Sequence, residues 1–433
     1  MELHGWGRYP RQQATLALPL SNTQCATTLA ASAPLIAHGL GRSYGDSALA
    51  ATVLGTPYLD HFVAFDDSTG ALTCQAGVSL DAILRTFVPR GWFLPVTPGT
   101  RFVTVGGAIA SDVHGKNHHA AGTFGAHVQH LELLLGNGAV VRASPTEHAD
   151  LFAATCGGMG LTGIILQASL ALKRIASSDI LQTTVKAPNL QAALDAFAEH
   201  ADSTYSVAWI DCLAKGASLG RSLLMLGEHA TDGPLQVQTR PPTPVPFDLP
   251  AVLLNHASVQ AFNALYYGRI RPPVSQQRLP FEPFFYPLDA VGQWNRLYGK
   301  PGFVQYQFVL PQAAGVAGLR EVLAAIAASG RGSFLAVLKV FGPANANFLS
   351  FPQAGFTLAL DFKAEPAVFT LLDELDAIVL HHGGRLYMAK DARMSAATFK
   401  ASYPTWQAFE DVRARWHAHG KFASSQSIRL GLQ

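Results

Sequence analysis

The sequence predicts an α+β fold with two domains. It holds 433 residues, and a single domain usually comprises about 100 to 200 residues. Between about residues 71 and 172, short apolar runs typical of strands alternate with short helical segments, each bounded by turn residues. Beyond Arg174 the pattern changes to a helical stretch followed by a new strand, which indicates that a second domain begins there.

Composition excludes several classes of protein. The 31 Lys and Arg residues nearly balance the 29 Asp and Glu residues, so the net charge of +2 provides no overall field for binding nucleic acid. Charged residues make up 14% of the chain and apolar residues 49%, which excludes disorder and predicts an apolar surface. The four cysteines form no C-x-x-C pair, which is consistent with a reducing compartment.

Two segments bear on the location of the protein. Residues 1–20 carry charged side chains and no apolar core, so no secretory signal is expected. The uncharged stretch from Leu151 to Leu172 is long enough to span a bilayer, but its glycines predict a turn between two buried elements. We therefore expect no transmembrane helix, and a location in the cytoplasm or at the periphery of the inner membrane.

The first domain contains clear local signals. Ser79 can cap the N-terminus of a helix, and Gly91 follows as its stop. The dipeptide Asn137-Gly138 separates two apolar runs and predicts a hairpin with a type I′ turn, in which both central residues have positive φ. Strands are expected at residues 72–76, 131–135, 139–143 and 161–172, and helices at residues 79–88 and 146–155.

The second domain combines regular elements with an irregular, proline-rich segment. Strands are expected at residues 205–210, 304–310, 334–341 and 356–362, and helices at 189–200, 316–328, 368–380 and 395–419, the last interrupted at Pro404. Between Pro234 and Pro287 lie 11 of the 26 prolines, interleaved with Phe, Leu and Tyr. We interpret residues 228–287 as mobile surface loops that contact something apolar; packing against their own domain is an equally open alternative.

A literal G-x-G-x-x-G motif spans Gly158 to Gly163. A dinucleotide fingerprint follows a strand and opens a helix, whereas here a helix precedes and a strand follows. We interpret this motif as a close-packed glycine turn.

Two further glycine-rich segments are better candidates for phosphate binding. In residues 38–46, successive backbone amides could form an anion-binding concavity to which Arg42 adds charge, although a tight turn alone would also need glycine. In residues 98–119, small residues lead into a polar patch with three histidines. Because no Asp, Glu or Cys follows His114 in that patch, a metal site is the weaker interpretation and a phosphate cradle leading to a cofactor ring is favoured.

The fourth cluster, residues 384–391, contains Lys390 beside Asp391. Such a pair is most often a solvated surface feature. A lysine in an apolar pocket would instead have a lowered pKa, and could transfer protons or bind an anionic substrate.

Together and in this order, the four clusters resemble the vanillyl-alcohol oxidase/p-cresol methylhydroxylase (PCMH) class of flavoproteins. The resemblance covers nearly the whole chain, and the most similar segments are residues 39–46, 98–122, 156–165, 305–308, 341–343 and 383–391. The resemblance implies a two-domain PCMH-type FAD-binding fold with an inserted substrate (cap) domain of antiparallel sheet plus helices. The implied division assigns residues 1–175 to the FAD domain, 176–384 to the cap, and 385–433 to a segment that completes the FAD domain and active site.

The resemblance also implies roles for individual residues. The implied FAD contacts are Gly39, Gly41, Arg42, Ser43, Tyr44, Gly45, Gly99, Thr100, Gly106, Gly107, Ala108, Ser111, Asp112, His114, Gly115, Asn117, Gly122, Ile165 and Tyr387. Catalytic roles fall to Lys390, Tyr387 and His114, and substrate contacts to Lys116, Trp209, Gln305, Gln307, Lys339 and Lys390.

Within the class, the resemblance is to enzymes that oxidise the C2′ hydroxyl of polyprenylphosphoryl-β-D-ribose, the first step of epimerisation to the arabinose donor for cell-wall arabinan. It implies a lipid-phosphate-linked sugar as substrate and peripheral contact with the membrane. A separate short-chain dehydrogenase/reductase would complete the epimerisation.

Two departures and two alternatives accompany this interpretation. Sugar-lactone oxidases of the class carry a histidine that bonds covalently to the flavin where this chain has Arg42, so noncovalent FAD is expected. Ala359 replaces a cysteine of the actinobacterial oxidases. A flavin-dependent oxidase of a soluble sugar, alditol or lactone is the enzymatic alternative. A flavin-binding module without catalysis is the other, and the presence of Tyr387, Lys390 and His114 weighs against it.

Overall fold

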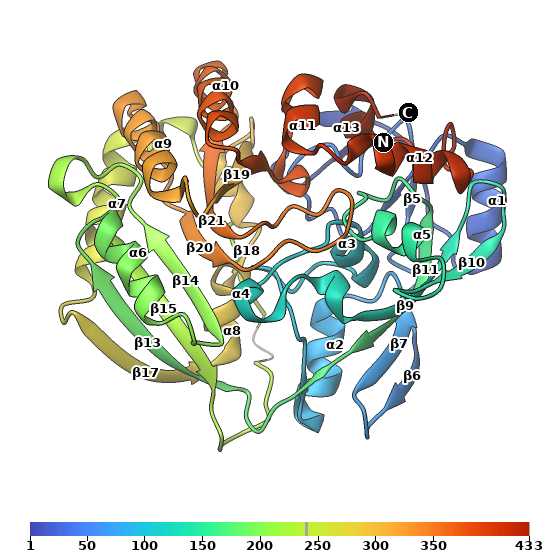
Figure 1. The fold of residues 1–433 in the computed structure, drawn as a ribbon, viewed down its shortest axis with the longest axis horizontal. Coiled ribbons are helices and arrows are strands. Elements are labelled where there is room, and N and C mark those ends of the chain that lie inside the picture. The colour runs from blue at the N-terminus through green and yellow to red at the C-terminus, as the bar shows by residue number, and fades with distance from the viewer. Residues whose placement is uncertain (239–240, 433) are drawn as a thin grey trace.

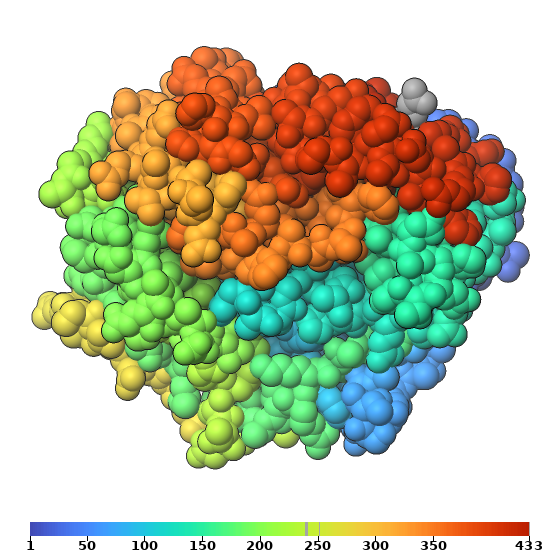
Figure 2. Space-filling model, viewed as in Figure 1, coloured from blue at the N-terminus to red at the C-terminus, as the bar shows by residue number. Residues whose placement is uncertain are grey.

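The computed structural model describes residues 1–238 and 241–432, and it confirms the α+β fold (Figure 1). Small sheets from the N-terminal part of the chain lie on one side of the molecule, and one large sheet from later residues lies on the other. The C-terminal helices, red in Figure 2, lie along the upper edge of the molecule in this view, beside both regions.

The N-terminal part of the chain forms two main sheets. One has the parallel order β3-β5-β4, and the other has the antiparallel order β10-β9-β11-β7-β6, against which α3 packs. The elements are β1 (Glu2–His4), β2 (Arg11–Gln13), β3 (Thr15–Ala17), α1 (Asn22–Ser32), β4 (Ile36–His38), β5 (Thr52–Gly55), β6 (Phe62–Asp66), β7 (Ala71–Gln75), α2 (Leu80–Phe87), β8 (Trp92–Phe93), α3 (Val105–Ala110), α4 (His118–Ala121), β9 (Val128–Leu134), β10 (Val140–Ala143), α5 (Ala149–Thr155), β11 (Ile164–Ala171) and β12 (Lys173–Arg174).

Local signals in this region are confirmed, with one correction. Ser79 caps α2 by accepting a hydrogen bond from the Ala82 amide. Strands β9 and β10 form the expected hairpin, but only Gly138 of the two expected turn residues has positive φ, at 87°. The Gly138 amide donates to the carbonyl of Leu135, and the Asn137 side chain accepts from Ala139. The type I′ prediction is therefore wrong, because one extra residue in the turn leaves a single left-handed position for glycine.

The larger sheet is antiparallel, with the order β17-β13-β15-β14-β20-β21-β19-β22. Alternate side chains of β19 and β21, including Tyr306, Phe308 and Leu360, are buried in a core shared with the helices α9 and α10. The remaining side chains of these strands point away from that core. The elements are β13 (Asp179–Ala187), α6 (Leu190–Glu199), β14 (Tyr205–Ile210), β15 (Ser222–His229), β17 (Val274–Pro280), β19 (Phe303–Pro311), α9 (Gly315–Ser329), β20 (Ala336–Phe341), β21 (Gly355–Lys363), α10 (Pro366–His381) and β22 (Arg385–Leu386).

The C-terminal segment returns to the N-terminal region. It contains α11 (Ala396–Ser402), α12 (Trp406–Arg415) and α13 (Ser425–Leu430), with the expected break at Pro404. Phe422 forms a parallel bridge with Leu35, next to β4. The implied division at residues 175 and 384 stays a prediction, and β22 departs from it by pairing with β19 in the larger sheet.

The proline-rich segment is more regular than expected. It contains β16 (Thr243–Pro244), α7 (His256–Gly268), β17 and α8 (Phe281–Phe285). Asn255 caps α7 in a reciprocal capping box with Ser258, and no proline interrupts that helix. The expectation of loops is therefore wrong for these elements, and their mobility stays a prediction, while residues 239–240 of the segment lie outside the described residues. Within the described part of the chain, no helix is long and apolar enough to cross a membrane.

Candidate active site

The two glycine-rich segments expected to bind phosphate lie against each other at the N-terminus of α3. Thr104 caps that helix by accepting a hydrogen bond from the Gly107 amide at 3.1 Å. A Cβ atom on residue 39 would lie 2.5 Å from Thr104 Oγ1, so this close approach requires glycine at position 39. Gly107 is exposed, and a Cβ on Gly99 would meet nothing within 4 Å. At Gly99 and Gly107 the backbone is therefore accessible and not covered by side chains.

Substituting Gly39 with alanine is expected to weaken FAD binding. The added methyl group would displace Thr104 and disturb the α3 cap, at a cost of about 1–3 kcal/mol of stability. The dissociation constant can be measured by titrating apoprotein with FAD and following flavin fluorescence. Gly268→Ala is a matched control, since its Cβ would meet nothing within 4 Å. Equal FAD affinity of the two variants would contradict the role of this contact.

The C-terminal segment that carries Lys390 packs directly on the first glycine-rich segment. The Tyr44 amide donates to the carbonyl of Ala389 at 3.1 Å. A Cβ on residue 45 would lie 1.8 Å from the carbonyl oxygen of Asp391, so only glycine allows the two backbones to approach this closely. Residues more than 340 positions apart in sequence are thereby held side by side.

One face of the larger sheet carries every substrate residue expected from this sheet. Gln305 lies opposite Asp361, Gln307 opposite Ala359, and Lys339 opposite Thr357. Cross-strand partners share a face, as do residues two apart on one strand. Trp209, which lies opposite Val337, belongs to the same face; it is buried, and its indole Nε1 donates to the carbonyl of Phe334. The expectation that Gln305 and Gln307 share a strand face is confirmed.

Ala359 lies on this face and is only half-buried, so a cysteine introduced there is expected to be reactive. The four native cysteines are buried. A thiol-directed reagent should therefore modify Ala359→Cys and leave the unsubstituted protein unmodified, as mass spectrometry of the intact proteins would show. Absence of modification in the variant would place residue 359 away from the accessible site.

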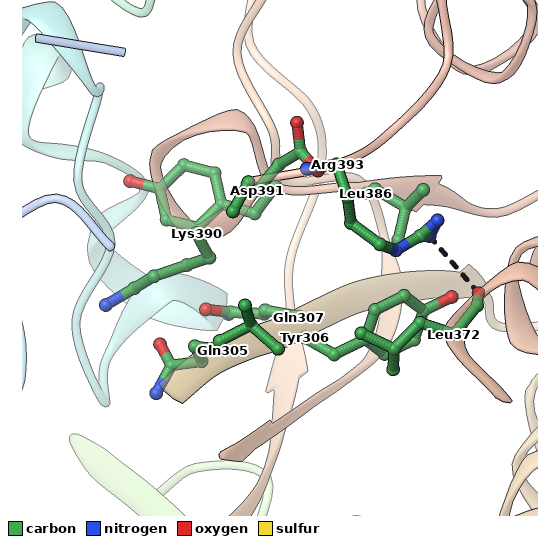
Figure 3. A pocket seen from close by; sticks show the side chains of 11 residues that line it. Gln305, Tyr306, Gln307, Leu372, Leu386, Lys390, Asp391 and Arg393 are labelled. Atoms are coloured by element: carbon green, nitrogen blue, oxygen red, sulfur yellow. Dashed lines mark hydrogen bonds between the residues drawn. The ribbon is translucent and has the colours of Figure 1, made fainter. Parts of the chain in front are cut away.

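Lys390 lies where the C-terminal segment, the first glycine-rich segment and the larger sheet meet. Its ammonium nitrogen is 3.8 Å from the centre of the Tyr44 ring. In Figure 3 the amine and the amides of Gln305 and Gln307 extend to the same side, away from Arg393. Burial lowers the pKa of Lys390, Asp361 opposes that shift, and the positive charge of Lys339 adds to it. The amine is therefore able to exist uncharged near neutral pH and to accept a proton.

His114 belongs to a hydrogen-bond chain that sets its tautomer. Thr357 donates its hydroxyl proton to the carbonyl of Phe308, so its oxygen accepts from Gln307 Nε2. The second proton of that amide nitrogen points to His114 Nε2 at 3.0 Å, which must then be the acceptor. Burial holds the pKa of His114 well below its usual value, so the ring is neutral and its proton is on Nδ1. Among the described residues Nδ1 has no hydrogen-bond partner, so it can donate to a bound molecule.

Two further lysines, Lys116 and Lys339, lie near the site and have lowered pKa values. Burial lowers the pKa of Lys116 to about 7 and that of Lys339 to about 8, and Lys339 also depresses the first of these. Each side chain is half-buried and so keeps partial access to solvent. Lys116 donates to the carbonyl of Phe284 and lies over its ring. An anionic substrate group would be favoured here.

Other expected residues occupy definite positions. Tyr387 donates to the carbonyl of Ser111 at 2.9 Å and stacks on Phe351. The guanidinium of Arg42 lies 4.0 Å from the centre of the Trp6 ring. The carboxylate of Asp112 accepts hydrogen bonds from Gly125, Asn345, Asn347 and Ser350, and its backbone amide donates to the carbonyl of Ile109, so the predicted contact of Asp112 with FAD gains no support here. Ile165 and Ala108 share a buried apolar cluster, and Asn117 donates to the carbonyl of Pro95.

Sequence reasoning missed three residues of the site. Asp361 hydrogen-bonds Gln305, Thr357 orients Gln307, and Arg429 bonds both Asp46 and Asp391. One signal was present: an aspartate in the mainly apolar strand over residues 356–362 needs a polar partner. Nothing in the sequence indicated Arg429, because its partners are 38 and 383 positions away.

These residues fit FAD. Bare backbone at Gly99 and Gly107, beside Arg42, suits a pyrophosphate. The unpaired donor at His114 Nδ1 suits a polar ring.

Comparison with known proteins agrees with this geometry. Residues 16–144 match the FAD binding domain family. The chain is 40% identical to the decaprenylphosphoryl-beta-D-ribose oxidase of Mycolicibacterium smegmatis, over 99% of this chain and 97% of that protein. It is 33% identical to an uncharacterised protein of Streptomyces coelicolor, over 82% of this chain and 100% of that protein. Similarity to a putative D-arabinono-1,4-lactone oxidase of Neurospora crassa, at 31% identity, covers 25% of this chain and 20% of that protein.

Proposed function

Because the chain belongs to the decaprenylphosphoryl-beta-D-ribose oxidase family, we propose that it is an FAD-dependent oxidoreductase that converts the C2′ hydroxyl of a polyprenylphosphoryl-β-D-ribose to a ketone. The supporting observation is that the similarity extends over 99% of the chain and so includes the larger sheet, which would be the substrate cap. The similarity to a lactone oxidase covers a quarter of the chain and does not extend to a whole site.

The protein's own residues would bind FAD and handle the substrate proton. The glycine-rich segments would hold the pyrophosphate, and Arg42 would pair with a phosphate without a covalent bond to the flavin. When bound, FAD supplies the acceptor for the hydride that leaves C2′. Lys390 Nζ would accept the hydroxyl proton. Neutral His114 would donate a hydrogen bond from Nδ1 to the bound molecule. Tyr387 would fix the position of the segment after α3 through its hydrogen bond to the carbonyl of Ser111.

The positive side of the site would select a phosphate-linked sugar. Burial lowers the pKa of both Lys339 and Lys116, and the charge of Lys339 lowers that of Lys116 further, so a bound anionic group would favour the ammonium forms of both. A sugar phosphate would supply the missing negative charge. A neutral sugar or lactone would not, so the lysines favour the lipid-phosphate-linked substrate over the soluble alternative.

The lipid tail of that substrate would remain in a membrane that the protein contacts at η4 (Ala251–Leu253) and α7. Leu265 is 76% exposed and Val252 73% exposed, which is unusual for large apolar side chains. The exposed Arg269 and Arg271 follow directly after α7 and would favour anionic lipid headgroups. This arrangement suits a peripheral contact of an amphipathic element with a lipid surface.

Replacing Leu265 with aspartate is expected to reduce sedimentation of the protein with vesicles that contain phosphatidylglycerol. The substitution would place a charge on the exposed apolar face of α7, where it would be repelled by the lipid headgroups. Leu20→Asp, a control at another exposed leucine, should sediment as the unsubstituted protein does. Sedimentation unaffected by Leu265→Asp, or absent from the start, would contradict the proposed contact.

The ketone product needs a reductant before it can yield the epimer. Return of hydride to C2′ on the opposite face is the reaction of a nicotinamide-dependent short-chain dehydrogenase/reductase, which would act as the partner enzyme.

The experiment that tests the proposed function is anaerobic stopped-flow measurement of the flavin absorbance. The purified protein would be mixed with polyprenylphosphoryl ribose and, separately, with free sugars, alditols and sugar lactones. Bleaching by the lipid-linked sugar alone is expected. Bleaching only by a soluble sugar would transfer the assignment to the alditol or lactone oxidases, and a protein without bound flavin would overturn it.

A further inference from the structure

Asp361 is a carboxylate buried beneath the site. It lies in β21 opposite Gln305, and only 1% of the residue is exposed. Its Oδ1 accepts a hydrogen bond from Gln305 Nε2, while Oδ2 has no partner among the described residues. An ionised carboxylate in such a place is costly unless a positive charge lies nearby.

The nearby positive charge is provided by Lys390. Gln305, which hydrogen-bonds Asp361, lines the same pocket as Lys390, and the Tyr44 ring underlies the Lys390 amine. The groups that face the amine are Tyr44 from the first glycine-rich segment, Asp361 from β21, Lys339 from β20 and His114 from the segment after α3. Of these charges, that of Asp361 favours the ammonium form and that of Lys339 opposes it.

We propose that Asp361 is a positioning residue that sets the pH at which Lys390 gains and loses its proton. The inference rests on the proposed function in one respect, since it takes Lys390 to be the group that accepts the substrate hydroxyl proton. As the proton moves from the hydroxyl to Nζ, the amine becomes an ammonium ion between Asp361 and Lys339. Asp361 stabilises that ion until the proton passes to solvent.

The charge balance decides the direction of the effect. Burial alone raises the pKa of Asp361 and lowers that of Lys390, and each group partly reverses the shift of the other. Each group therefore favours the charged form of the other. Without the Asp361 charge, burial and Lys339 would both act against the ammonium form, and Lys390 would lose its proton at lower pH.

The test compares the FAD-loaded protein with its Asp361→Asn variant, in which Oδ1 can still accept from Gln305. Acetic anhydride would be applied at a series of pH values, and modification of Lys390 would be quantified by peptide mass spectrometry. The midpoint of labelling is expected to move to lower pH by about one unit or more in the variant. An unchanged midpoint, or one at higher pH, would overturn the proposal. Asp361→Ala provides a second uncharged variant should the first not fold.

A matched control and a second readout complete the test. Asp376 is also a buried carboxylate, but it accepts from the Tyr306 hydroxyl on the opposite side of β19, so Asp376→Asn should leave the Lys390 midpoint in place. The rate of anaerobic flavin reduction is expected to rise with pH. The pH midpoint of this rise, called the rising limb of the rate profile, is expected to move together with the labelling midpoint. If labelling moves and this limb does not, Asp361 controls Lys390 as proposed, and the role of Lys390 as proton acceptor fails separately.

Discussion

Lys390→Met is expected to slow flavin reduction by polyprenylphosphoryl ribose about 100-fold to 10,000-fold, which is the usual contribution of a positioned general base. Methionine has a similar length and keeps an apolar chain over the Tyr44 ring, but it has no group that accepts a proton. FAD should remain bound, because the glycine-rich segments do not depend on the amine. Stopped-flow absorbance measures the rate, and the flavin spectrum of the purified variant measures FAD content.

The pH dependence gives a second check of the same residue. Burial lowers the pKa of Lys390, so the uncharged amine becomes more abundant as pH rises through the neutral range. The rate of flavin reduction should rise with pH over that range in the unsubstituted protein and lose this dependence in Lys390→Met. Lys400→Met, at an exposed position of α11, is the control and should retain the normal rate and profile. A near-normal rate in Lys390→Met with FAD bound would exclude the assigned role.

Arg429→Met is expected to lower the free energy of unfolding by about 3 kcal/mol and to reduce the amount of FAD that the protein retains. Arg429 Nη2 donates to Asp46 Oδ1 at 2.6 Å and to Asp391 Oδ2 at 2.9 Å. Both carboxylates are buried and would lose their counter-charge. Because Asp46 is the last residue of the first glycine-rich segment and Asp391 follows Lys390, the variant should also loosen both parts of the site.

Urea unfolding followed by circular dichroism would measure the loss of stability. The deficit should shrink as pH falls, because removal of Arg429 raises the pKa of Asp46 further and protonation then removes its uncompensated charge. Arg415→Met is the matched control: its ion pair with Asp150 is exposed and is expected to contribute less than about 1 kcal/mol. Equal losses in the two variants would show that Arg429 is an ordinary surface arginine.

The two errors of sequence interpretation have physical causes. Asn137-Gly138 is a strong signal for a two-residue turn. The pairing of β9 with β10 makes the turn one residue longer, and Gly138 is then its left-handed residue. The proline-rich segment was expected to form loops, yet its prolines fall outside α7, which has its own capping box at Asn255. In both cases the prediction relied on the residue types in a segment. The positions of single residues within that segment decided its conformation.

The sequence by itself determined the α+β class, most of the helices and strands, and the glycine-rich segments with Lys390 near the end of the chain. These features depend on interactions between residues a few positions apart, such as the cap at Ser79 or the alternation of Gln305 and Gln307. Only the tertiary structure decided that Asp361 lies near Lys390, that Thr357 orients His114 through Gln307, and that Arg429 joins Asp46 to Asp391. The physical reason is that burial and charge pairing act between atoms brought together by strand register and chain return. The pKa of a side chain therefore depends on neighbours that are distant in sequence.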